Sequence, residues 1–125
     1  MQLGRHRSAL RYLRRSLAVR GMPLNERHRG SVLGSLADAY LGDGQPARAA
    51  EHAQLSVEAF RRADYRHGEA IALRQLGRIH AAQGEVQPAL GQLRLALTMF
   101  AALGSEQARQ TRTEIESLHR ELNKI

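Results

Sequence analysis

Apolar residues recur along most of the chain at the spacing of an α-helix. Residues at i, i+3, i+4 and i+7 share one face of a helix, so such a set marks a buried stripe. The chain contains this set twice, 40 residues apart: Leu33, Leu36, Ala37 and Tyr40, then Leu73, Leu76, Gly77 and His80.

The same 40-residue period runs through the glycines. Gly4, Gly44 and Gly84 are each followed by an alanine five residues later. Pro46 and Pro88 come shortly after the second and third glycines, and glycine then proline is the usual stop and start signal between helices. A fixed period of about 20–50 residues is typical of a solenoid, in which each unit buries its apolar face against its neighbours.

We therefore predict a single all-α domain over residues 1–125, a right-handed solenoid of antiparallel helix hairpins with about six helices. Residues 4–21 align with the second helix of a repeat, so the first helix of that repeat is missing. Complete repeats are expected at 26–61 and 66–101. A capping helix is expected at 105–123, because its outward face is polar.

Composition argues against an enzyme. The chain has no cysteine, which excludes disulfides, a thiolate nucleophile and cysteine-ligated metal. Its six histidines show no metal-binding spacing, and no catalytic triad or phosphate loop is evident. We expect no catalytic residue, cofactor or metal. No apolar run approaches the length of a membrane span and no signal peptide is evident, so we expect a cytoplasmic protein without a membrane partner.

The net charge of +7 is concentrated at the start of the chain. Residues 1–30 hold eight arginines against one acid, and the remainder is balanced. We interpret the basic stripe of the first helix as a solvated face, or one covered by other parts of a longer protein, because it lacks aromatic residues that stack on bases. The alternative is a module that assists nucleic-acid binding through residues 5–20. The stripe covers a sector of about 100° on a helix and consists of Arg7, Arg11, Arg14 and Arg15.

Residues 36–40 (Leu-Ala-Asp-Ala-Tyr) and 76–80 (Leu-Gly-Arg-Ile-His), each followed by a glycine and an alanine, resemble the tetratricopeptide repeat. The early tryptophan typical of that family is a leucine in both copies, and the period is 40 rather than about 34 residues. The 40-residue form further resembles repeats in the C-terminal regions of actinobacterial transcriptional activators, which also carry a winged-helix DNA-binding domain and an ATPase module. The resemblance implies a non-enzymatic protein-protein interaction module of a bacterial regulatory protein.

The resemblance also implies a binding groove lined by one face of the first helices, which would take a peptide or a partner domain. Arg74 and Arg78 lie four residues apart, so both could hold a carboxylate or an acidic peptide. The alternative is that they make exposed ion pairs of little energetic value. The candidate groove residues are Ser31, Ser35, Asp38, Arg74, Gln75, Arg78, Glu116 and Arg120.

The first helix suggests one more association. Because it lacks its usual hairpin partner, its apolar face could pair with a second copy of the chain. That face carries Leu10, Leu13 and Leu17, and we predict a homodimer through these residues.

Overall fold

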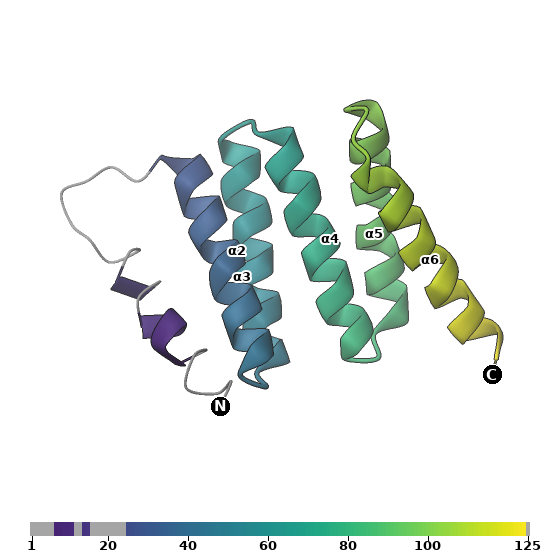
Figure 1. The fold of residues 1–125 in the computed structure, drawn as a ribbon, viewed down its shortest axis with the longest axis horizontal. Helices are drawn as coiled ribbons and strands as arrows, with labels where there is room; N and C mark the ends of the chain where they lie inside the picture. The colour runs from purple at the N-terminus through teal and green to yellow at the C-terminus, as the bar shows by residue number, and fades with distance from the viewer. Residues whose placement is uncertain (1–6, 12–13, 16–24, 125) are drawn as a thin grey trace.

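The computed structural model describes residues 7–11, 14–15 and 25–124. Residues 7–11 and 14–15 are helical, and the rest of the expected first helix lies outside the described residues. Five helices follow in chain order, and each packs mainly on the helices before and after it (Figure 1). They are α2 (Glu26–Gly42), α3 (Pro46–Arg62), α4 (Arg66–Ala82), α5 (Val86–Ala102) and α6 (Gln107–Asn123). The predicted all-α solenoid is confirmed.

The turns explain the glycine spacing and divide the 40-residue period in two. A residue with positive φ occurs in each of the four turns, at Gly44 (75°), Asp64 (53°), Gly84 (80°) and Gly104 (67°). In each turn the next residue donates its N–H to the carbonyl five residues earlier, at 2.9 or 3.0 Å, which closes the helix end. Glycine adopts this conformation without steric penalty. The chain therefore repeats a 20-residue unit of helix and turn.

Small residues let neighbouring helices approach closely. Ala49, Ala53 and Ala89 are fully buried at helix contacts. Phe60 of α3 packs beneath two first helices, and a Cβ atom added at Gly30 or Gly68 would lie 2.8 or 2.5 Å from its ring. The scarcity of side-chain atoms at these positions thus sets the spacing of α2, α3 and α4.

Helix α6 covers the end of the core with few apolar residues. Ile115 is 7% exposed and Thr111 is fully buried, while Leu118 and Leu122 are half-buried against α5. Ser105 Oγ accepts the Gln107 N–H at 3.2 Å and so helps to close the start of the helix. The remaining surface of α6 is largely polar.

The described part of the first helix packs onto the core. Leu10 is 6% exposed and belongs to a cluster with residues of α2 and α3. The expectation that Leu10 presents an open face to a second copy therefore needs correction, because α2 and α3 already cover this side chain. Leu13 and Leu17 lie outside the described residues, and the homodimer stays a prediction. None of the described helices is both long and apolar enough to cross a membrane.

Candidate functional site

A groove of about 430 Å³ runs between α2 and α4, the first helices of the two complete hairpins. Six of the eight predicted site residues line it, because both helices turn the same face toward it. The walls and floor comprise Gly30, Ser31, Gly34, Ser35 and Asp38 of α2, Ser56 and Phe60 of α3, Tyr65, the α4 residues Gly68, Ile71, Ala72, Arg74, Gln75 and Arg78, and Gln107 of α6.

Glu116 and Arg120 are exposed on α6 and do not line the groove, which corrects that part of the prediction. Glu114, with Gln107 and Gln110, contacts α4 from α6 instead. On a helix of 3.6 residues per turn, positions 116 and 120 lie about 200° and 240° round from position 114. The alignment of this helix with the first helices of the two repeats was therefore rotated, so it selected a polar face that points away from α4.

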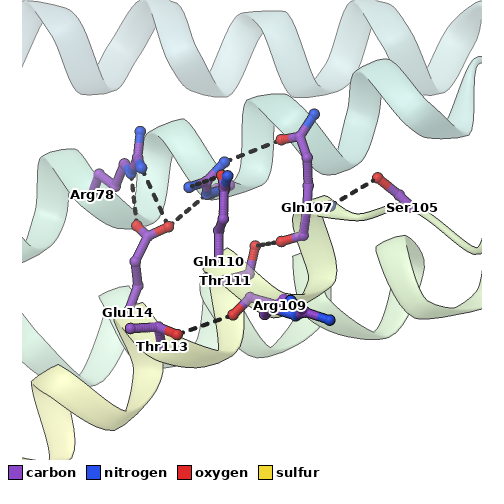
Figure 2. A network of polar contacts seen from close by, with 9 residues as sticks. Arg78, Ser105, Gln107, Arg109, Gln110, Thr111, Thr113 and Glu114 are labelled. Carbon is purple, nitrogen blue, oxygen red and sulfur yellow. Dashed lines mark hydrogen bonds and ion pairs between the residues drawn. The ribbon is translucent and has the colours of Figure 1, made fainter.

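A polar network joins α4, one wall of the groove, to α6 (Figure 2). The two oxygens of the Glu114 carboxylate contact different arginines: Oε1 lies 2.6 Å from Arg74 Nε, and Oε2 lies 2.6 Å from Arg78 Nε. Arg74 also donates to the side-chain oxygens of Gln107 and Gln110, at 3.1 and 3.2 Å. The Glu114 carboxylate thus accepts hydrogen bonds from two guanidinium groups of α4 and holds α6 against that helix.

The two arginines differ in what they can offer a ligand. The Arg74 side chain is only 12% exposed and each of its three guanidinium nitrogens donates to a side chain of α6, whereas the Arg78 side chain is 56% exposed. The expectation that both are open to a ligand therefore needs correction. Arg74 holds α4 to α6, and Arg78 is the cation that reaches solvent.

Gln75 bridges the groove from α4 to α2. Its Nε2 donates to the Gly34 carbonyl at 2.9 Å and to Asp38 Oδ1 at 2.7 Å. Gly34 forms the floor beside this bridge, and an added Cβ there would meet Ser56 Oγ at 3.5 Å and Gln75 Oε1 at 3.6 Å, both ordinary contacts. Gln75 thus links the two walls by two hydrogen bonds, and glycine at position 34 leaves the floor there without a side chain.

The opposite end of the groove is apolar and was missed by the sequence analysis. Phe60 and Tyr65 meet edge to face with ring centroids 5.7 Å apart, and Ile71 is 41% exposed beside them. The Arg27 guanidinium lies 3.8 Å from the Tyr65 ring centroid, at cation–π distance. The sequence did hold a signal for this apolar end, because Ile71 occupies the position that Ser31 has in the previous repeat.

The chemistry of this groove suits binding. No histidine or cysteine occurs among the residues that line it. No group of three histidine, cysteine, aspartate or glutamate side chains in the described part of the chain is arranged to hold a metal ion. The groove offers exposed hydroxyls, two opposite charges and an apolar end.

The basic stripe of the first helix is partly engaged with α2 and the turn that follows it. Arg14 Nε donates to Tyr40 Oη at 3.1 Å, and Arg7 Nε lies 3.9 Å from Asp43 Oδ1. Arg11 and Arg15 are exposed. Nucleic-acid contact through residues 5–20 stays a prediction, since part of that range lies outside the described residues.

Comparison with known proteins agrees with this architecture. The family model "Tetratricopeptide repeat" matches residues 28–102, which is more than half of the chain. No curated protein matches the sequence. Among solved structures, nearly identical TPR-like repeats assigned to a putative kinesin light chain of Podosopora anserina, and a point variant of the same repeats, each superpose with a TM-score of 0.77 at 21% identity. The match covers 93% of this chain and 58% of each of those chains. At that identity the likeness shows the fold alone. The family match over residues 28–102 shows that this chain belongs to the tetratricopeptide repeat family.

Proposed function

We propose that the groove between α2 and α4 binds an extended segment of a partner protein. Tetratricopeptide repeats indicate a protein-protein interaction module, and the observation that carries the proposal is the position of this groove. Its volume of about 430 Å³ falls in the range of known ligand sites. It lies between the first helices. Its α2 wall exposes polar side chains throughout, and its α4 wall exposes the apolar Ile71 at one end and Arg78 at the other.

An extended segment suits the groove because the walls offer contacts to both backbone and side chains. Ser31 Oγ donates to the Arg27 carbonyl at 3.3 Å, which leaves its lone pairs free to accept a peptide N–H. Ser35 and Asp38 continue this exposed polar row along α2. On α4, Ile71 and Arg78 supply an apolar and a charged contact.

The test is selection of peptides from a random library on the immobilised chain, followed by binding to a variant with a filled groove. Gly34→Leu adds a side chain at the open floor, where the Cβ itself fits without a clash. Gly91→Leu is the matched control, since Gly91 is an exposed helical glycine of α5 with no atom within 4 Å of an added Cβ.

We expect the selected peptides to lose at least about tenfold in affinity on Gly34→Leu, or about 1.4 kcal/mol. They should bind Gly91→Leu like the unaltered chain. Failure to enrich any peptide, or equal binding to both variants, would contradict the proposal.

We also infer that the module acts within a bacterial regulatory protein, as a region beside a winged-helix domain or an ATPase module. The support is the 40-residue form of the repeat, which resembles those regions. Sequencing the complete reading frame is the test. A winged-helix or ATPase segment in the same frame supports the inference, and a complete frame with neither contradicts it.

A further inference from the structure

The two walls of the groove carry different residues at equivalent positions of the two repeats. Forty residues separate Ser31 of α2 from Ile71 of α4, and Asp38 from Arg78. One end of the groove is therefore apolar on the α4 side, and the other end has an anion on α2 and a cation on α4. Because all four residues line the same groove, one bound segment can contact both ends.

We propose, building on the proposed function, that the partner segment is an extended strand with an apolar residue about three positions away from a neighbouring pair of one basic and one acidic residue. The apolar side chain lies against Ile71, Phe60 and Tyr65. The basic side chain contacts Asp38, and the acidic side chain contacts Arg78.

The spacing follows from the geometry of helix and strand. Ile71 and Arg78 are seven residues apart on α4. At a rise of 1.5 Å per residue this is about 10.5 Å along the groove. An extended chain advances about 3.3 Å per residue, so about three strand residues cover the distance. Because side chains alternate along a strand, the residue three positions from the apolar one faces α2 and is the basic residue, and the acidic residue that directly precedes or follows it faces α4.

The order of charges follows from the alternation of side chains along a strand. Consecutive side chains point to opposite sides, so two neighbours in a strand within the groove face α2 and α4 respectively. The neighbour that faces α2 meets Asp38, and the one that faces α4 meets Arg78. A basic and an acidic residue in adjacent positions therefore match the groove. Of two adjacent basic residues, one would face Arg78, and of two adjacent acidic residues, one would face Asp38.

Both charges remain available to a partner. Asp38 contacts Gln75 through Oδ1, and Arg78 contacts Glu114 through Nε and Nη2. No ion pair within 4 Å joins Asp38 to Arg78 in the described part of the chain. Arg74 and Arg78 share the single Glu114 carboxylate, and the Arg78 side chain is 56% exposed, so it can also contact a carboxylate of a partner.

The experiment uses the peptides selected on the full chain. We expect those that depend on an open Gly34 to share an apolar residue and, about three positions away, an adjacent basic and acidic pair. Two synthetic peptides that differ only in lysine or glutamate at the basic position are then compared by titration. The unaltered chain should prefer lysine by about tenfold or more, Asp38→Asn should lose this preference, and Asp38→Lys should reverse it.

The outcomes separate this inference from the proposed function. Two results would overturn the inference and leave the groove as a binding site. One is that the peptides that bind only with glycine at position 34 lack the charged pair. The other is that the preference for lysine is unchanged in Asp38→Lys. If no peptide is enriched, both proposals are overturned. Because Asp38 is exposed on the helix surface, circular dichroism should show that both variants keep the fold.

Discussion

The same substitution, glycine to alanine, should change stability in opposite directions at two positions of the groove. At Gly34 the new Cβ would lie 3.5 Å from Ser56 Oγ, an ordinary contact. At Gly68 it would lie 2.5 Å from Phe60 Cδ1 and 2.7 Å from Tyr65 Cδ2, which is closer than carbon atoms approach in proteins. Phe60 is 7% exposed and packed in the core, so its ring has little room to move.

The magnitudes follow from these distances. Alanine is favoured over glycine inside a helix by about 0.5–1 kcal/mol, so Gly34→Ala should raise the free energy of unfolding by about that amount. At Gly68 the overpacking of the two rings should cost about 1–3 kcal/mol and outweigh any gain in helix propensity. A difference of about 1 kcal/mol corresponds to a shift of several degrees in Tm for a domain of this size.

Urea unfolding followed by far-UV circular dichroism measures both effects. The m-value should stay constant, which shows that the change lies in stability and not in the surface exposed on unfolding. Gly91→Ala is the control for propensity alone, because an added Cβ there meets no atom within 4 Å. If Gly68→Ala stabilises the chain as much as Gly91→Ala does, the argument that the Phe60 ring requires glycine at position 68 is refuted.

Four further substitutions test the core and the contact between α4 and α6. Arg74→Ala should lower the free energy of unfolding by about 1–3 kcal/mol, since this side chain is only 12% exposed and bonds three residues of α6. Arg78→Ala should change the free energy of unfolding by less than about 1 kcal/mol, because its side chain is 56% exposed. Equal losses in urea unfolding would contradict the distinct roles of the two arginines. Ser56→Ala removes a buried hydroxyl that donates to the Gly30 carbonyl at 2.7 Å, and should lower the same free energy by about 1–3 kcal/mol, with no measurable change as the contrary result. Phe100→Ala, at a fully buried ring, should lower it by about 3–5 kcal/mol, and a Tm close to that of the unaltered chain would speak against its place in the core.

The periodicity of the chain predicted the fold because every repeat follows the same local rules. Helical spacing of apolar residues defined the buried faces, and the glycines at 44 and 84 adopt the positive φ that ends each first helix. The turn at Asp64 was less evident, because it uses a residue other than glycine for the same conformation. A short period with local contacts makes such a fold accessible to sequence reasoning.

The groove was predicted in part, for a reason that lies in helix rotation. Ser31, Ser35 and Asp38 could be assigned to the groove because equivalent residues of α2 and α4 are 40 positions apart and lie on the same helix face. Glu116 and Arg120 could not, since the contact of α6 with α4 depends on how α6 rotates about its own axis when it packs on α5. That rotation is set by a few buried side chains, and the linear sequence does not display it.

The sequence by itself thus determined the repeat, the helices and the face that lines the groove, because these depend on spacing along one helix. Only the tertiary structure decided that Glu114 joins Arg74 to Arg78, that Gln75 bridges to Asp38, and that Phe60 and Tyr65 form the apolar end. Each of these contacts joins residues of different helices or of a turn between them. Their side chains meet at distances fixed by packing, and packing is a property of the assembled helices.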